Sequence, residues 1–481
     1  MKDLYDANRE MDSCGIGAAV SIDGIASTRI LDQALGIVEH LGHRAGRDAD
    51  GKTGDGVGVL MQIDHDYFRR AADLCYPGRY GAGMFFLPAE EAASAACRKD
   101  FETAAAALGM GDLCWRIVPV HPEILGERAR STCPDIRQCF LARPAADQED
   151  LDFERRLYRL RRRFEKQHPE AFVCSLSCRT IVYKGMFLVD QLRRFYEDLA
   201  AGSYCTALAM VHARFSTNTL PSWKRAHPYR MLLHNGEINT IIGNTAKMKA
   251  RQESSPSLAF ADTPEIYPVV DEDGSDSAVL DNSAEYLALE GMPLAKAVRI
   301  LIPEPWENSR MLSEPMKEFY EYEANLMEPW DGPAAVVFSD GDVLGAILDR
   351  NGLRPARYVL SSDNCLYLAS EAGAWNIPEE KITRSGRLAP GRILLVDTKR
   401  KRIIPEEEFR QTTAQEHPYG QWLQENCLEL RDLKGSNEET PLHGDHLLLQ
   451  QKLGGFHYED VHFYLTRLLH EKKEPVVSMG R

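Results

Sequence analysis

The chain has 481 residues, of which 44% are hydrophobic and 27% charged; this describes a soluble globular protein with enough core for two to four domains, or for one unusually large one. Its net charge of -15 argues against general nucleic-acid binding, which needs a basic face. The longest apolar runs, such as 334–338, are too short to span a bilayer, and the leader 1–10 lacks the apolar core of a secretory signal. We therefore expect a cytoplasmic protein that does not bind membranes.

The cysteine content agrees with a reducing compartment. Eleven cysteines in a long chain without a secretory signal indicate reduced thiols rather than a disulfide framework. Cys133 and Cys139 are closely spaced, as are Cys174 and Cys178, but no second Cys or His pair stands at zinc-finger spacing from either. We expect these four thiols to be buried rather than bound to a metal.

The first informative stretch is Met11-Asp12-Ser13-Cys14-Gly15-Ile16-Gly17, which leads into a predicted buried strand at 18–22. Small residues after the Cys14 thiol let the backbone approach a substrate closely. If residues 1–13 were removed, Cys14 would carry a free α-amino group, whose pKa of roughly 7.7 to 8.0 suits a general base. The competing interpretation, which this stretch alone favours, is a small apolar residue in an N-terminal strand.

Helical periodicity alternates with short β-rich runs over the next 180 or so residues. The pattern predicts helices at 30–41, 91–108, 150–167 and 188–199, and strands within 53–61, 115–120 and 180–186. The helix at 150–167 is rich in arginine, and we interpret this as a solvated face, with contact to an acidic partner as the alternative.

The second informative stretch is 211–219, where a predicted strand at 206–211 leads into Arg214. Small hydroxyl and amide residues follow, among them Thr217. A guanidinium group in this setting can bind a carboxylate through two parallel hydrogen bonds. A surface ion pair is the competing interpretation.

Two later stretches carry further polar groups. Asn235 and Gly236 follow a predicted strand at 230–233, and such a pair usually marks a turn. The Asn235 amide and the Gly236 N–H could also donate to one developing oxyanion, as acyl transfer requires. Asp276 lies in a Gly/Ser turn where its carboxylate could bind an ammonium group, although N-capping of a predicted helix at 278–289 competes.

The remaining chain contains strands at 333–338 and 343–348 around a hairpin turn, and then a polar linker at 432–441 with two short helices beyond it. Taken together, the candidate groups specify a substrate. An arginine for an α-carboxylate, an aspartate for an α-ammonium group and an oxyanion hole beside a thiol describe an amino acid with a reactive side-chain carbonyl. Glutamine has this structure.

The sequence closely resembles a known family over almost its full length. It is similar to the glutamine amidotransferase domain of the glutamate synthase large subunit, one of the N-terminal-nucleophile (class II) amidotransferases. The resemblance rests on many motifs in the family's order. They are Cys14-Gly15-Ile16-Gly17, Thr53-Gly54-Asp55-Gly56, Tyr183-Lys184-Gly185-Met186, Arg214-Phe215-Ser216-Thr217-Asn218-Thr219, His234-Asn235-Gly236-Glu237-Ile238-Asn239, Ser275-Asp276-Ser277-Ala278, Glu328-Pro329-Trp330-Asp331-Gly332-Pro333 and Leu348-Asp349-Arg350-Asn351-Gly352-Leu353-Arg354-Pro355.

The resemblance implies an α+β fold, a four-layer αββα sandwich of the N-terminal-nucleophile hydrolase type with a short helical C-terminal extension. It also implies roles for the candidate residues. Cys14 would be the nucleophile after removal of residues 1–13, and its α-amine the base. Asn235 and Gly236 would form the oxyanion hole. Arg214 and Thr217 would bind the glutamine α-carboxylate and Asp276 the α-ammonium group, so that a cysteine thioester forms and ammonia is released.

The resemblance further implies a partner. In the family, ammonia passes to a synthase part that carries FMN and an iron–sulfur cluster and aminates 2-oxoglutarate. This chain has no Cys-rich cluster motif and no stretch long enough for a (β/α)₈ barrel, so we expect it to carry neither cofactor. It would be a separately encoded subunit or a truncated product, working with a glutamate synthase FMN-binding domain or subunit.

We therefore expect a removable leader at 1–13, an amidotransferase domain at 14–430, and a linker with the start of a central region at 431–481. Two other functions remain open. One is a class II amidotransferase that delivers ammonia to another acceptor. The other is a non-catalytic glutamine-binding module, favoured if the leader stays attached, because an acylated α-nitrogen is no base.

Overall fold

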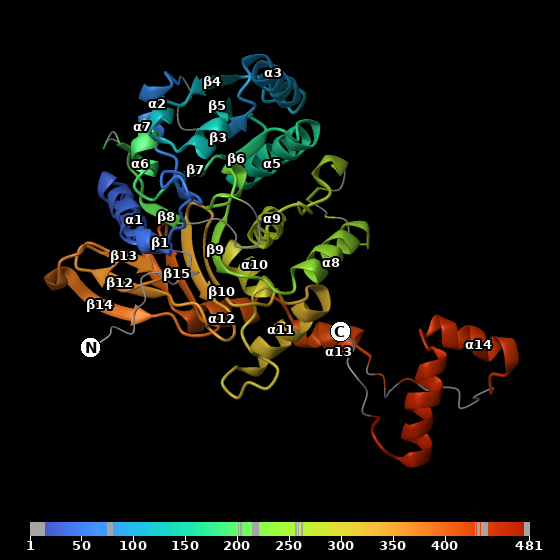
Figure 1. The fold of residues 1–481 in the computed structure, drawn as a ribbon. Helices are drawn as coiled ribbons and strands as arrows, with labels where there is room; N and C mark the ends of the chain where they lie inside the picture. The colour runs from blue at the N-terminus through green and yellow to red at the C-terminus, as the bar shows by residue number, and fades with distance from the viewer. Residues whose placement is uncertain are drawn as a thin grey trace. The chain divides into compact units, whose positions relative to one another are not determined.

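The computed structural model describes residues 15–74, 80–200, 202, 204–213, 221–254, 257, 259–260, 263–428, 430, 433 and 441–475. The chain divides into two compact units, Met1–Leu423 and Gln424–Arg481. The strands of the described residues all belong to the larger unit, where they form three antiparallel sheets (Figure 1).

The first sheet has seven strands, and the N-terminal strand β1 lies inside it between β13 and β8. All residues of β1 are buried. Gly17 leaves room for helix α1 (Thr28–His40), because a Cβ on Gly17 would lie 2.4 Å from Ile37 Cγ2. In spatial order the strands are β14 (Ile382–Arg387), β12 (Arg357–Ser361), β13 (Cys365–Ala369), β1 (Gly15–Ser21), β8 (Leu208–Ala213), β2 (Val57–Gln62) and β7 (Thr180–Gly185).

The second sheet has five strands and stacks on the first. Alternate residues of a strand point to opposite faces. Ala335 and Val337 of β10 belong to the core that contains the first sheet, whereas Ala334, Val336 and Phe338 belong to a second core with helices α9 and α10. In spatial order the strands are β16 (Arg402–Ile404), β15 (Ile393–Asp397), β11 (Val343–Leu348), β10 (Ala334–Ser339) and β9 (Leu232–Gly236).

Helices cover the outer faces of both sheets. Helix α1 packs on the first sheet, and α9 (Asp276–Leu289) and α10 (Leu294–Leu301) pack on the second (Figure 1). The layers therefore run helix, sheet, sheet, helix, which confirms the predicted α+β sandwich.

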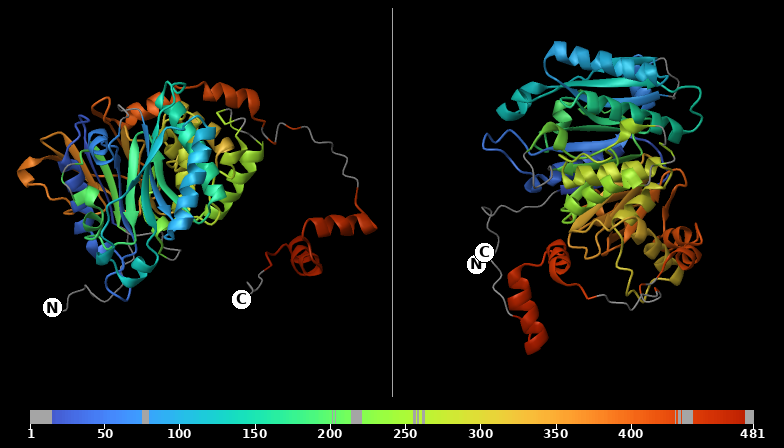
Figure 2. Two further views of the ribbon diagram at one scale, coloured as in Figure 1. Left: turned by 90° about the horizontal axis from the view of Figure 1, so that it is seen from above. Right: turned by 90° about the vertical axis from the view of Figure 1, so that its right-hand side faces the viewer.

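A third sheet extends this unit beyond the four predicted layers. Its strands are β4 (Leu113–Ile117), β5 (Asp135–Ala142), β3 (Tyr80–Leu87) and β6 (Phe172–Ser177) in spatial order. Helices α3 (Glu91–Ala107) and α5 (Asp150–Gln167) pack on one face (Figure 2). Phe101 of α3 and Phe164 of α5 contact Phe85 of β3. The opposite face, including Met84 and Phe86, joins the core of the first sheet.

Two local predictions are wrong. The helix predicted at 188–199 is two short ones, α6 (Leu192–Phe195) and α7 (Glu197–Ala200), because Tyr196 between them is extended and bridges to Val120. The arginine-rich face of α5 is not simply solvated. Arg161 is 1% exposed and contacts Glu285 at 2.5 Å, and Arg155 Nε donates to the Leu289 carbonyl at 2.7 Å.

Several further helices belong to the two units. The unit Gln424–Arg481 contains α14, which agrees with the predicted helical extension, followed by helical turns at Asp460–Leu465 and Arg467–Glu471. The helices not yet named are α2 (His65–Ala71), α4 (Glu127–Ser131), α8 (Ile241–Ser254), α11 (Glu314–Leu326), α12 (Glu406–Ala414), α13 (Tyr419–Asn426) and α14 (Gly444–Leu453).

Candidate active site

Three of the six predicted site residues lie outside the described part of the chain. They are Cys14, Arg214 and Thr217. The strands on either side of them are described: Cys14 is the residue before β1, and Arg214 is the residue after β8. Gly15 and Ala213, the adjoining strand ends, are direct partners in the first sheet. The fold thus brings together two stretches that are about 200 residues apart in the sequence.

The predicted oxyanion residues lie at the end of β9, in the second sheet. Asn235 pairs with Ala335 and Gly236 with Ala334, both at the start of β10. The two sheets are joined near this point by His212 of β8, whose Nε2–H donates to the carbonyl oxygen of His234 at 3.0 Å. This bond links the strand that leads to Arg214 with the strand that carries Asn235 and Gly236.

The backbone at Gly236 has a conformation that requires glycine. Its φ is +141°, and a Cβ would lie 1.7 Å from the carbonyl oxygen of Pro333. Gly332 makes the reciprocal approach, with φ +157° and a hypothetical Cβ 1.9 Å from the Glu237 carbonyl oxygen. Glu237 N–H donates to the Pro333 oxygen at 3.1 Å. The Gly332-Pro333 segment therefore holds the Gly236 end of β9 in place from directly opposite.

Asp276 is the first residue of α9 and is hydrogen-bonded to the segment just after β9. Its Oδ2 accepts from the Ile238 N–H at 3.0 Å, and its Oδ1 accepts from the Ser277 N–H at 2.7 Å. The helix cap is the preceding residue, Ser275, whose side chain accepts from Ala278 N–H. N-capping therefore does not account for Asp276, and its carboxylate lies at the positive end of the helix dipole.

A surface cavity of about 570 Å³ opens beside this carboxylate. Asp276 lines it, together with Ile238 and Glu237. Helix α8 contributes Ile241, Ile242 and Thr245 to its wall. The cavity thus joins a carboxylate to the segment that follows β9.

Buried histidines lie near the end of β9, and the sequence analysis gave them no role. The rings of His212 and His227 stack with centroids 4.3 Å apart, and His234 Nδ1 lies 2.9 Å from the Ser277 hydroxyl. Burial lowers the pKa of His227 well below its usual value and also lowers that of His234. His212 and His234 stand inside the stretches singled out from the sequence, but residue type alone does not reveal contacts between strands.

Two acidic residues that the sequence analysis gave no role also hold β9 and β10. Asp349 Oδ1 accepts from Ala334 N–H at 3.0 Å, which fixes the start of β10 opposite Gly236. Asp281 of α9 is fully buried and accepts from the N–H groups of Arg230, Met231 and Leu232 just before and at the start of β9. Burial, reinforced by the nearby Glu285, raises the pKa of Asp281 to about 6. The start of β9 and the start of β10 are thus each tied to a carboxylate.

The described residues include no helix that is both long and apolar enough to cross a membrane.

Sequence comparison places this site in a family. Residues 14–422 match the family described as class II glutamine amidotransferases. The chain is 41% identical to the glutamate synthase [NADPH] large chain of Bacillus subtilis, over 99% of this chain and 32% of that protein. It is 38% identical to ferredoxin-dependent glutamate synthase 2 of Synechocystis, over 98% of this chain and 31% of that protein.

A third relative is glutamate synthase [NADH] of Schizosaccharomyces pombe, 38% identical over 99% of this chain and 24% of that protein. The chain thus spans about a third or less of the length of these relatives. They differ in the electron donor that their names give, while all match this chain to a similar degree. By the family match and these identities, the chain belongs to the class II glutamine amidotransferases and is similar to the amidotransferase portion of glutamate synthase large chains.

Proposed function

We propose that this chain hydrolyses glutamine to glutamate and ammonia, with Cys14 as the nucleophile once residues 1–13 have been removed. The observation that carries the proposal is the meeting of three described segments. They are the paired strand ends Gly15 and Ala213, the end of β9 at Asn235 and Gly236, and Asp276, which accepts a hydrogen bond from Ile238. Cys14 directly precedes the first segment in the sequence.

In this proposal the substrate is held at both ends of its amino-acid group. Arg214, with Thr217, binds the α-carboxylate, since a guanidinium group matches a carboxylate in charge and geometry. Asp276 binds the α-ammonium group, and its position on the cavity wall supports this role. These contacts present the side-chain amide of glutamine to the Cys14 thiol.

The reaction then proceeds through a thioester. The Cys14 α-amine accepts the thiol proton while Sγ forms a bond to the amide carbon of the substrate. The oxygen of that amide becomes negative and accepts hydrogen bonds from the Asn235 side chain and the Gly236 N–H. The amide nitrogen takes up the proton of the Cys14 ammonium group as the C–N bond breaks, and it leaves as ammonia. Water then attacks the thioester, which yields glutamate and restores the thiol.

We further propose that the ammonia is consumed by a glutamate synthase FMN-binding domain or subunit, which carries FMN and an iron–sulfur cluster and aminates 2-oxoglutarate. The names of the relatives support this assignment, because all three are glutamate synthases of which this chain matches one part. On this proposal the chain itself carries no cofactor for the reaction. It acts in the cytoplasm, in keeping with cysteines that form no disulfide within the described residues.

The test combines intact mass with ammonia release from glutamine on the same purified sample. A chain that begins at Cys14, with an activity that is lost in Cys14→Ala, is the expected result. An unprocessed and inactive chain that still binds glutamine would instead identify a binding module. Addition of an FMN-containing synthase part should then give glutamine-dependent glutamate formation from 2-oxoglutarate, and failure of that step alone would redirect the ammonia to another acceptor.

A further inference from the structure

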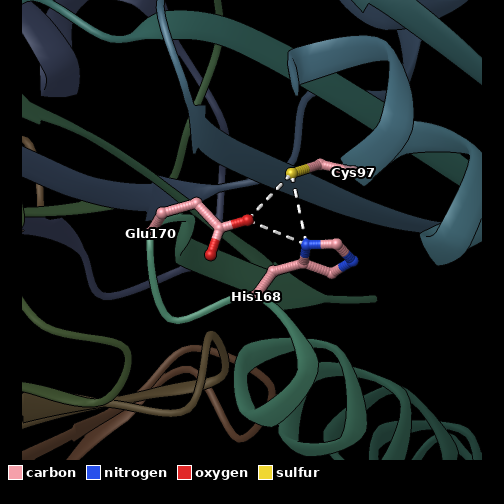
Figure 3. A group of neighbouring side chains, drawn as sticks. All are labelled: Cys97, His168 and Glu170. Atoms are coloured by element: carbon pink, nitrogen blue, oxygen red, sulfur yellow. Dashed lines mark hydrogen bonds and ion pairs between the residues drawn. The ribbon is translucent and has the colours of Figure 1, made fainter. Parts of the chain in front are cut away.

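A second cluster of reactive side chains lies on the third sheet, in elements that do not form the candidate active site. Cys97 comes from the middle of α3, His168 follows the end of α5, and Glu170 lies in the turn before β6 (Figure 3). The Cys97 Sγ is 3.5 Å from His168 Nδ1 and 3.7 Å from Glu170 Oε1. His168 Nδ1 and Glu170 Oε1 are 2.9 Å apart.

We propose that Cys97, His168 and Glu170 bind a zinc ion. A thiolate, an imidazole and a carboxylate form a ligand set that suits Zn²⁺, with a fourth position open to water. Zinc bond lengths in a tetrahedron place S and N ligands, or S and O ligands, about 3.6 Å apart, and N and O ligands about 3.3 Å apart. The three observed separations lie within about 0.4 Å of these values, so small side-chain rotations would complete the site.

A carboxylate behind the imidazole supports the proposal. His168 Nε2 lies 3.1 Å from Asp100 Oδ2, and Asp100 is on α3 one turn after Cys97. The ring thus has Nε2 facing Asp100 and Nδ1 facing Cys97 and Glu170, and a zinc ion bound at Nδ1 would leave the Nε2–H to donate to the Asp100 carboxylate. Histidine ligands of metals are commonly oriented by a carboxylate in this way, which fixes the ring and increases its basicity.

Burial restricts access to the cluster from solvent. Cys97 is 1% exposed and His168 9% exposed, whereas Glu170 is exposed. The His168 ring also packs against Phe164, with centroids 5.1 Å apart. Glu170 therefore forms the solvent-facing side of the cluster, while burial keeps the Cys97 sulfur out of reach of a substrate. This geometry favours a bound metal over a reactive cysteine.

A zinc ion here would connect two parts of the layer that covers the third sheet. Helix α3 supplies Cys97, and the turn between α5 and β6 supplies the other two ligands. Without the ion, these parts are joined by apolar contacts and by the hydrogen bonds within the cluster. The ion would thus fasten this helical layer without taking part in glutamine hydrolysis.

The test uses the full chain, freed of metal with a chelator and titrated with Co²⁺ as a spectroscopic substitute for Zn²⁺. We expect one equivalent to give tetrahedral visible bands and a thiolate-to-metal charge-transfer band, both removed by stoichiometric Zn²⁺. Cys97→Ser should abolish the charge-transfer band and weaken zinc binding by at least 10-fold. Cys114→Ser, on β4 of the third sheet, is the control and should change neither.

Two milder variants guard against loss of folding. Glu170→Gln removes an exposed ligand, and Asp100→Asn removes the carboxylate behind the imidazole; each should weaken zinc binding about 10- to 100-fold. Glutaminase activity should be the same in all these variants, which separates this site from the proposed function. Zinc binding of equal strength in the wild type, Cys97→Ser and Glu170→Gln would overturn the proposal, as would the lack of any charge-transfer band. In that case the cluster is an imidazolium hydrogen-bonded to two carboxylates.

Discussion

Replacing Gly236 with alanine should remove most of the activity while leaving the protein folded. The new Cβ would lie 1.7 Å from the Pro333 oxygen, and such contacts are not found below 3.0 Å, so β9 must move away from Pro333 by about 1.3 Å. The Glu237–Pro333 hydrogen bond of 3.1 Å would then break. Its loss costs about 1 kcal/mol of stability, and alanine at a φ of +141° adds about 1 to 3 kcal/mol.

The same displacement moves the Gly236 N–H away from the substrate oxygen. Misplacement of a reacting group by about 1 Å costs roughly 100-fold, and loss of an oxyanion donor about 100- to 1,000-fold, so we expect kcat to fall by that range. Gly332→Ala should act similarly, although Gly332 takes no part in the chemistry, because its Cβ would push on the Glu237 carbonyl oxygen from the other side.

The assay is ammonia release from glutamine, with urea unfolding on the same samples. Gly36→Ala is the control: it lies within α1 and its Cβ would meet nothing within 4 Å. It should leave kcat unchanged and raise stability by up to about 1 kcal/mol. A folded Gly236→Ala protein with kcat within about threefold of the wild type would refute the idea that the Gly236 end of β9, held by Gly332 and Pro333, forms the oxyanion site.

Three further predictions follow from individual contacts. Asp276→Asn should raise the KM for glutamine about 10- to 100-fold with a much smaller change in kcat, and an unchanged KM in steady-state assays would exclude ammonium binding at this carboxylate. Arg161→Met should destabilise the protein by about 3 to 5 kcal/mol in urea unfolding, because it leaves Glu285 buried without its 2.5 Å partner; Arg161→Met with Glu285→Leu should recover at least half of this loss. Burial lowers the pKa of His227 well below 6.5, so below pH 6.5 the unfolded chain binds a proton at His227 that the folded protein does not bind. The stability linked to neutral His227 is therefore fully present above pH 6.5 and is lost as the pH falls. From pH 7 to 5.5 the wild type should lose about 1 kcal/mol more than His227→Gln in unfolding experiments, and equal losses would contradict the assignment.

Local periodicity was sufficient to locate most of the elements. Helix α5 and the hairpin of β10 and β11 were predicted nearly to their ends, because an apolar stripe or an Asp-Gly turn is a local property. The split at Tyr196 could not be foreseen, since it depends on a bridge to Val120, 76 residues earlier. The third sheet was not recognised as a separate layer for the same reason: strand pairing is not encoded in any single stretch.

The candidate site was predicted as a set of residues but not as a geometry. The order of motifs identified Asn235, Gly236 and Asp276, yet the bond from Ile238 to Asp276 joins residues 38 apart. Cys97 and His168 were missed because they are 71 residues apart, and a search for closely spaced cysteines found Cys174 and Cys178 instead. Contacts between distant elements require the fold before they can be seen.

The position of β1 also has a consequence for the order in which the protein can mature. The Ile16 N–H donates to the Ser370 hydroxyl, 354 residues later, and β13 forms one whole side of β1. At a synthesis rate of about 5 to 20 residues per second, β1 leaves the ribosome roughly 20 to 70 s before its partner exists. The strand next to Cys14 therefore completes its pairing only after β13 and Ser370 have been synthesised. If residues 1–13 are removed as proposed, any processing that requires this sheet would follow the synthesis of β13.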